Sequence, residues 1–289
     1  MKSTLSNYFL LTKPPIMLLV VFSGATALFM EGSLVGEPYH FLLILIALFL
    51  TGGSANALNQ YFERDIDKKM TRTQKRRPLP QGKINATGAF IFSAAIGLVG
   101  VVIFALFFNI LSALLALGTI LFYSLFYTLL LKPNTPQNIV IGGVAGAMPP
   151  LIAWAAAGGS LLQSSPWILF LIIFFWTPPH FWALALFYKE DYKEANLPMM
   201  PVIKGEEETL KQVFYYTLIL VGVTLTLLAA DARWLYLVVS VALGALFIKK
   251  SYDTRKYKTK QLEKKLFFYS IIYLFSLFFA IIIDGFLFS

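Results

Sequence analysis

The sequence predicts an all-α, polytopic membrane protein with nine transmembrane helices, its N-terminus inside and its C-terminus outside. Three observations lead to this prediction. The 289 residues are 58% hydrophobic and only 13% charged, which is about half the charged share of a soluble protein. Apolar stretches long enough to cross a bilayer recur along the whole chain. Finally, Lys and Arg residues fall almost entirely on one side of the predicted membrane.

Nine apolar stretches come close to the roughly 20 residues that a bilayer core requires. Their predicted bounds are 15–29, 40–58, 86–108, 110–131, 139–157, 167–187, 213–230, 234–248 and 266–287. Only Asn109 separates the third stretch from the fourth, but about 45 residues are too many for a single crossing. The sequence Lys13-Pro14-Pro15 leads directly into the first stretch without a convincing cleavage site, so we expect this span to be retained. Residues 1–289 are therefore expected to form one integral-membrane domain.

The distribution of basic residues supports the count of nine spans. Of the 24 Lys and Arg residues, all except Arg233 lie in segments that this count places inside. Because basic residues favour the cytoplasmic side, we expect a protein of the bacterial inner membrane with these loops in the cytoplasm. The bases are divided among several loops beside anionic lipid, which argues against a nucleic-acid partner. Cys is absent, which excludes disulfides, thiolate metal sites and Cys nucleophiles.

The first of three inside loops, residues 59–85, carries regularly spaced oxygen ligands. Asn59, Glu63 and Asp67 are four residues apart, so on a helix they lie within about 80° of arc and about 12 Å of rise. Basic residues follow closely, among them Arg72, Arg76 and Arg77. Carboxylates of this kind hold Mg²⁺ together with substrate phosphates. The alternative is an interfacial helix whose acids neutralise the bases that anchor it.

The other two inside loops are residues 131–138 and 188–212. Lys132 either points at the same phosphates or anchors a tight turn at the lipid headgroups. In the third loop Asp191 is the candidate ligand, with Lys189 or Glu190 as the second candidate. For Glu190, Lys193 and Glu194 the alternative is a mixed-charge amphipathic helix. Asp67 and Asp191 each follow a span, and the two spans are four apart. Both acids should therefore face the same side, which makes a four-helix repeat plausible.

Several longer strings in the chain match a known family. They are residues 59–67, Met70-Thr71-Arg72-Thr73, Arg77-Pro78-Leu79-Pro80, residues 138–152 with Gly142, Gly143 and Gly146, Pro179-His180-Phe181-Trp182-Ala183-Leu184, Asp191-Tyr192 and Pro198-Met199-Met200-Pro201. With these strings the chain resembles the UbiA superfamily of intramembrane prenyltransferases, and within it the branch that farnesylates haem. Two positions depart from the superfamily pattern. Glu63 stands where Asp is usual, and Phe187 stands four residues before Asp191 where a second acid is usual.

The resemblance implies a UbiA-type helical bundle and a specific reaction. A farnesyl group would pass from farnesyl diphosphate to a vinyl group of haem b, giving haem O. Mg²⁺ would be held by Glu63, Asp67 and Asp191, with Asn59 accepting or orienting a ligand or a water. The diphosphate would be bound by Arg72, Arg76, Arg77, Lys132 and Lys189. The resemblance also implies haem A synthase as a partner.

An allylic cation requires a dry cavity lined by aromatic rings. The candidates for the prenyl or haem pocket are Tyr61, Tyr123, Tyr127, Trp154 and Trp182, and the alternative for each is simple packing. His180 lies within the sixth span, where a polar residue predicts function. It could contact the haem iron or a propionate, or hydrogen-bond to another helix. The only other histidine, His40, lies near an outside span end and is expected to be interfacial.

Two other functions remain open from the residues alone. A prenyltransferase of the same superfamily could act on a quinone ring or a chlorin, although the strings around residues 142–150 and 179–184 favour haem. A secondary transporter also uses repeats and broken helices. Transporters rarely need a carboxylate face next to a basic cluster outside the core, so we expect an enzyme.

Overall fold

The computed structural model describes residues 2–230 and 232–288, and all regular structure in these residues is helical. Nine helical segments of the described residues, some of them made of consecutive helices, are long and apolar enough to cross a membrane. The prediction of an all-α protein with nine spans is therefore confirmed. Each predicted stretch overlaps one candidate span, from Pro14–Glu31 at the N-terminal end to Lys260–Leu287 at the other.

The helices follow one another with short connections. In chain order they are α1 (Lys2–Leu11), α2 (Pro14–Glu31), α3 (Pro38–Phe62), α4 (Arg64–Asp67), α5 (Thr71–Gln74), α6 (Ala86–Phe107), α7 (Ile110–Leu121), the π-helix η1 (Phe122–Leu131), α8 (Lys132–Asn134), α9 (Asn138–Ala147), α10 (Pro149–Ala156), α11 (Ser164–Phe187), α12 (Lys189–Glu194), α13 (Met200–Ile203), α14 (Gly205–Thr226), the 3₁₀ helix η2 (Leu227–Ala229), α15 (Trp234–Tyr257) and α16 (Lys260–Phe288).

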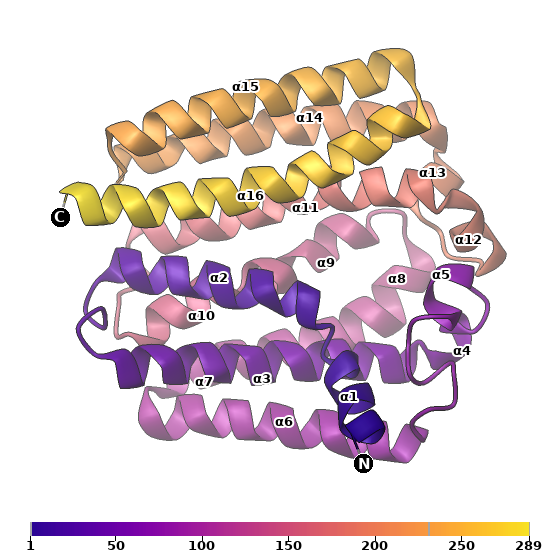
Figure 1. Ribbon diagram of the computed structural model, residues 1–289, viewed down its shortest axis with the longest axis horizontal. Helices are drawn as coiled ribbons and strands as arrows, with labels where there is room; N and C mark the ends of the chain where they lie inside the picture. Colours follow the sequence, from indigo (N-terminus) through magenta and orange to yellow (C-terminus); the bar gives the residue numbers. More distant parts are fainter. Residues whose placement is uncertain (1, 231, 289) are drawn as a thin grey trace.

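The long helices form a bundle in which neighbours in sequence are mostly neighbours in space. Helix α3 packs against α6 and α2, whereas α11 packs against α9, α14 and α16. The hairpin of α15 and α16 lies along α14 and α11 (Figure 1). The short helices α4, α5, α8, α12 and α13 gather at one end of the bundle (Figure 1). The three predicted inside loops therefore meet at a common end.

Asparagine caps mark two of the helix starts that the sequence predicts. Asn109 has an extended backbone, and its Oδ1 accepts the backbone N–H of Ser112 at 2.9 Å. Its amide nitrogen donates to the carbonyl of Ala155 at 2.6 Å, which ties the connection to α10. Asn85 caps α6 in the same way, accepting from Gly88. Capping satisfies N–H groups that would otherwise lack partners, so the division at Asn109 is real.

Prolines affect the two central spans differently. The fifth span consists of two helices, because α9 ends at Ala147 and Pro149 begins α10. The sixth span continues unbroken through Pro178 and Pro179. The fourth span also departs from a regular α-helix, since η1 is a π-helix of ten residues. Such π segments are rare and often occur at functional sites.

Candidate active site

The oxygen ligands predicted in the first inside loop lie on one face, although the helix that carries them is interrupted. Helix α3 ends at Phe62, and α4 begins at Arg64. The helical hydrogen bonds continue across the break, since Glu63 N–H donates to the Asn59 carbonyl at 3.0 Å and Asp67 N–H to the Glu63 carbonyl at 2.8 Å. The helix is interrupted at Glu63, but its hydrogen bonds keep the four-residue spacing that places the three side chains together.

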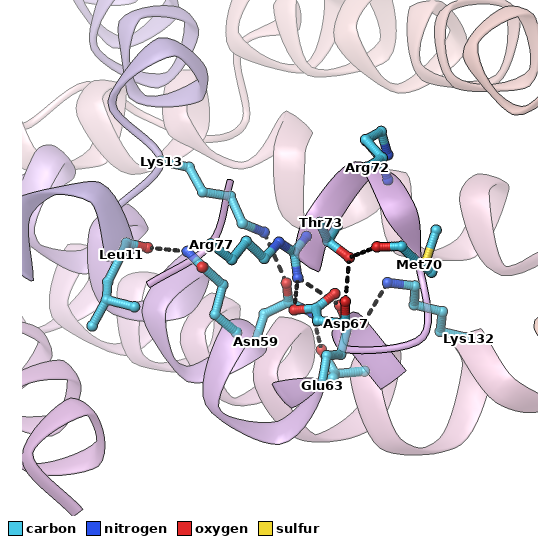
Figure 2. A network of polar contacts seen from close by, with 12 residues as sticks. Leu11, Lys13, Asn59, Glu63, Asp67, Met70, Arg72, Thr73, Arg77 and Lys132 are labelled. Atoms are coloured by element: carbon cyan, nitrogen blue, oxygen red, sulfur yellow. Dashed lines mark hydrogen bonds and ion pairs between the residues drawn. The ribbon is translucent and has the colours of Figure 1, made fainter. Parts of the chain in front are cut away.

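Glu63 and Asp67 are the centre of a buried charge cluster (Figure 2). Their side chains are only 2% exposed, and both accept from Nη1 of Arg77, which lies 3.4 Å from Glu63 Oε2 and in closer contact with Asp67 Oδ2. Lys132, at the start of α8, forms an ion pair with Glu63 Oε1. Two of the basic residues predicted to bind a diphosphate thus lie directly on the predicted metal ligands.

Lys13 belongs to this cluster and was missed in the sequence. Its Nζ donates to Oδ1 of Asn59 at 2.8 Å, across 46 residues of sequence. The amide nitrogen of Asn59 donates in turn to Oγ1 of Thr128 in η1 at 3.0 Å. Lys13 has a left-handed backbone, φ 54°, immediately before the two prolines that start α2. A lone base placed directly before a span was the available signal.

The electrostatics favour an additional anion. Burial alone would raise the pKa of the Glu63 carboxyl, but the charges of Lys132, Arg77 and Lys13 outweigh burial and lower the pKa to about 2. Burial raises the pKa of Asp67, with Arg77 opposing that rise. Burial and repulsion by Arg77 lower the pKa of the Lys13 ammonium well below its usual range. Three bases share two acids here, and a nearby anion favours their charged forms.

Arg72 connects the first inside loop to the third. Its backbone N–H donates to Oδ2 of Asp191 at 3.1 Å, and its Nη2 donates to the Tyr192 hydroxyl at 3.3 Å. The guanidinium lies over the ring of Tyr188 at 5.0 Å and that of Tyr192 at 5.8 Å. The side chain of Arg72 was predicted to bind diphosphate, but it is clamped between these tyrosines. Next to it, the Thr73 hydroxyl donates to the carbonyl of Asp67 at 2.9 Å.

The donor set of the cluster fits a hard divalent cation. Glu63 and Asp67 offer carboxylate oxygens to the same guanidinium group, and carboxylates are ligands that Mg²⁺ prefers. Within the described residues, no group of three Asp, Glu or His side chains is arranged to hold a metal ion. Asp191 lies apart from the pair and is bound to the backbone of Arg72. The cationic groups of Arg77 and Lys132 contact the oxygens that a metal would need.

The remaining predicted phosphate ligands make fewer contacts. Arg76 is exposed and Lys189 is half-buried. In the described part of the chain, the side chain of neither residue forms a hydrogen bond or an ion pair. Both lie on segments at the same end of the bundle, since Arg76 follows α5 and Lys189 begins α12. Their assignment to diphosphate binding stays a prediction.

The predicted aromatic residues divide between two ends of the molecule. Tyr123 and Tyr127 stack in η1, with ring centroids 5.1 Å apart, on the helix that also holds Thr128 beside Asn59. Trp182 is fully buried in α11 against Tyr216. Trp154, a candidate for the prenyl or haem pocket, lies away from the charge cluster. It lies on α10 and lines a cavity of about 510 Å³ with Met30, Glu31 and Gln163 at the opposite ends of the helices.

The two histidines differ in burial and in the residues that they contact. His40 is half-buried, with 43% of its side chain exposed, and interacts with Glu37 through Nδ1 at 2.7 Å. His180 is buried, and its Nδ1 lies 2.7 Å from the Ser270 hydroxyl. This contact joins α11 to α16, so the helix-to-helix hydrogen bond considered for His180 exists. Tyr61, another predicted aromatic, lies 4.8 Å beneath the guanidinium of Arg64.

Comparison with known proteins gives consistent similarities. A family model described as the UbiA prenyltransferase family matches residues 18–272. A protein of Gloeobacter violaceus named protoheme IX farnesyltransferase is 46% identical over 287 residues, covering 99% of this chain and 93% of that protein. A protein of the same name from Rippkaea orientalis is 44% identical over 282 residues, covering 96% of this chain and 87% of that protein.

Solved structures share the fold. One described as digeranylgeranylglyceryl phosphate synthase superposes with a TM-score of 0.80 at 22% identity, over 99% of both chains. A UbiA homologue from Archaeoglobus fulgidus, bound to DMAPP and Mg²⁺, superposes with a TM-score of 0.62 at 17% identity, over 96% of this chain and 99% of that chain. At these identities the similarity concerns the arrangement of the helices alone.

Proposed function

This chain belongs to the UbiA prenyltransferase family, and from that premise we propose that it transfers a farnesyl group from farnesyl diphosphate to a vinyl group of haem b. The products are haem O and diphosphate. The observation that carries the proposal is the buried cluster of Glu63 and Asp67 with three bases at one end of a bundle of membrane-spanning helices. Full-length relatives named protoheme IX farnesyltransferase, 42–46% identical, support the choice of prenyl donor and acceptor.

Glu63, Asp67 and Asp191 would hold Mg²⁺, and Asn59 would orient a ligand or a water. When bound, the metal withdraws electron density from the diphosphate and so makes it a better leaving group. The close approach of Arg77 and Lys132 to the same oxygens supports this assignment, because it identifies a place where cations are stabilised. Asp191 would contribute from the third inside loop, which Arg72 connects to the first.

The bases supply the electrostatic part of the reaction. As the bond between farnesyl C1 and oxygen breaks, its electron pair leaves with the diphosphate, and negative charge grows on the leaving oxygens. Arg77 and Lys132 carry positive charge where that negative charge grows, and the diphosphate favours the charged form of Lys13 beside them. These bases therefore stabilise the transition state more than the ground state. Arg76 and Lys189 lie at the same end and would hold the outer phosphate. No side-chain nucleophile is required.

The vinyl group completes the transfer. Its terminal carbon attacks farnesyl C1, which leaves a cation on the carbon next to the macrocycle. Water adds to that carbon and loses a proton, which gives the hydroxyethylfarnesyl side chain of haem O. The stacked rings of Tyr123 and Tyr127 and the buried indole of Trp182 would face the cation and exclude bulk water. His180 is the candidate for contact with haem.

We place the cluster on the cytoplasmic face of the bacterial inner membrane. The support is the charge pattern, in which all Lys and Arg residues except Arg233 belong to one side. Farnesyl diphosphate and haem b both carry anionic groups on a large apolar body, which suits entry at a membrane boundary. Haem O formed there could pass to haem A synthase, which we keep as a proposed partner.

The test uses purified full-length protein in lipid nanodiscs with farnesyl diphosphate, haem b and Mg²⁺. We expect haem O by chromatography and mass spectrometry, with one diphosphate released per haem O. Asp67→Asn and Asp191→Asn should lower the rate at least about 100-fold, because metal stabilisation of developing charge contributes several kcal/mol. Asp65→Asn is the matched control, since Asp65 is 70% exposed and pairs with Lys68 on the surface.

Two outcomes would overturn the proposal. If haem b is unchanged while a quinone ring or a chlorin is prenylated, the acceptor is wrong. If Asp67→Asn and Asp191→Asn release diphosphate as fast as Asp65→Asn does, the carboxylates do not take part in catalysis. Uptake of an unmodified solute into vesicles, with no prenylated product, would indicate a transporter.

A further inference from the structure

The imidazole of His180 is held on several sides inside the bundle. The indole of Trp176 stacks on it with centroids 4.2 Å apart and planes 18° apart. Phe267, from α16, lies at 4.7 Å with planes 26° apart. Phe181 meets the ring edge-on at 5.0 Å. The ring is therefore fixed between two helices, and its two nitrogens point in defined directions.

The hydrogen bonds around the ring determine which nitrogen carries the proton. The Ser270 hydroxyl lies 2.7 Å from Nδ1 of His180, and it also donates to the carbonyl of Phe267 at 2.6 Å. A carbonyl can only accept, and a hydroxyl has one hydrogen to donate. Ser270 therefore accepts from His180, so Nδ1 carries the hydrogen and Nε2 carries the lone pair. Trp176 stabilises the same turn by donating to the Ser270 carbonyl at 2.7 Å.

Nε2 has no hydrogen-bond partner among the described residues. Histidines that bind metals almost always donate their other ring N–H to an oxygen, which fixes the tautomer and the ring orientation. His180 and Ser270 have this arrangement. A polar residue inside a membrane span costs free energy, and such residues usually have a function. Helix-to-helix bonding alone would need only one of the two nitrogens.

We propose that Nε2 of His180 binds the iron of haem b as an axial ligand, and that Ser270 is a positioning residue that keeps the imidazole in the tautomer able to do so. This inference rests on the proposed function and names the contact that holds the acceptor. Because His180 lies on α11 and Ser270 on α16, the ligand depends on the packing of these two helices. Iron ligation would place the macrocycle at a fixed depth, and so place its vinyl group relative to the prenyl donor.

The experiment measures haem coordination without prenyl donor. Full-length protein in nanodiscs is loaded with ferric haem b, and its absorption and electron paramagnetic resonance spectra are recorded. We expect the spectra of an imidazole-ligated haem in the wild type and their loss in His180→Gly, with recovery on addition of free imidazole. His40→Gln is the matched control, because His40 is the only other histidine in the chain. It should leave the spectra unchanged.

Ser270 is tested by a second pair of variants. Ser270→Ala removes the acceptor for Nδ1–H, and we expect haem affinity to fall at least about tenfold, as is usual when the partner of a metal-binding histidine is removed. Ser270→Thr keeps the hydroxyl and should restore both spectrum and affinity. Ser240→Ala is the control, because Ser240 is also buried and donates to a carbonyl three residues earlier, but touches no histidine.

The outcomes separate this inference from the proposed function. If His180→Gly keeps the wild-type spectra while the wild type makes haem O, the ligand assignment is overturned and the function stands. If the wild type makes no haem O, the function itself fails. If His180→Gly does not fold, the Ser270 variants decide. Equal haem affinity in Ser270→Ala, Ser270→Thr and Ser240→Ala would overturn the positioning role.

Discussion

Glu63 illustrates how a buried acid depends on its partners. Its carboxylate is 2% exposed and is bound by Lys132 on one oxygen and Arg77 on the other. Removal of one partner from a buried ion pair leaves an uncompensated charge, which is more costly than the loss of the interaction itself. The ligand-free protein should therefore be sensitive to each base in the cluster, before any effect on catalysis is considered.

We predict that Lys132→Gln destabilises the ligand-free protein by about 3–5 kcal/mol, because Glu63 loses its closest partner in a buried site. Lys211→Gln should cost at most about 1 kcal/mol, since Lys211 and Glu208 form an exposed pair 3.7 Å apart. Unfolding in detergent, followed by fluorescence, measures both. The double variant Glu63→Gln with Lys132→Gln should be more stable than Lys132→Gln alone. Equal effects of Lys132→Gln and Lys211→Gln would contradict the prediction.

At the scale of elements, the clamp around Arg72 connects two segments that both carry predicted metal ligands. Its backbone holds Asp191, and its side chain is enclosed by Tyr188 and Tyr192. We predict that Arg72→Ala raises the Mg²⁺ concentration needed for half-maximal haem O formation by about tenfold, because residues that support a metal ligand commonly have that effect. Arg64→Ala is the control, since Arg64 also covers a tyrosine ring but forms its ion pair with Asp65, which is not a predicted metal ligand. A Mg²⁺ requirement unchanged in Arg72→Ala would show that the clamp does not position Asp191.

The π-helix η1 depends on a close approach to α9. A Cβ atom added to Gly142 would overlap the ring of Tyr127, which stacks on Tyr123. We predict that Gly142→Ala destabilises the protein by about 1–3 kcal/mol, the usual cost of overpacking a core. Gly222→Ala is the matched control, because nothing lies within 4 Å of its added Cβ and alanine favours a helix by up to about 1 kcal/mol. If both variants unfold at the same temperature, η1 can move away without cost.

The elements also explain which parts of the fold the sequence could predict. Apolar length and the cap at Asn109 are local, so the nine spans follow from them. The two proline pairs look alike in sequence, yet Pro149 begins a new helix whereas Pro178 lies within one. Proline removes an N–H donor wherever it occurs, and the packing of α11 against α9, α14 and α16 keeps its helix continuous. That packing is not visible in a local pattern.

At the scale of the whole molecule, local sequence patterns predict only part of the candidate site. The carboxylates and Lys132 followed from spacing and from the side of the membrane, and they do meet. Lys13 reaches Asn59 across 46 residues, a contact that only the tertiary fold creates. Trp154, in contrast, could have been placed from the sequence. It lies sixteen residues beyond Asn138, which at 1.5 Å per residue is about 24 Å along a span and so near the far side of the membrane.

Orientation in the membrane is the last prediction, and the chain offers a direct way to measure it. It contains no cysteine, so single cysteines can be introduced without removing any. The charge pattern predicts that Gln74→Cys and Thr259→Cys face the cytoplasm, whereas Gly36→Cys and Ser160→Cys face outward, and all four positions are exposed. In intact spheroplasts, a membrane-impermeant maleimide should label only Gly36→Cys and Ser160→Cys, and all four after permeabilisation. Because each span reverses the side, labelling of Gln74→Cys in intact spheroplasts would invert the topology and place the carboxylate cluster outside. The diphosphate of the prenyl donor would then have to be supplied from that side, and the proposed cytoplasmic reaction would be wrong.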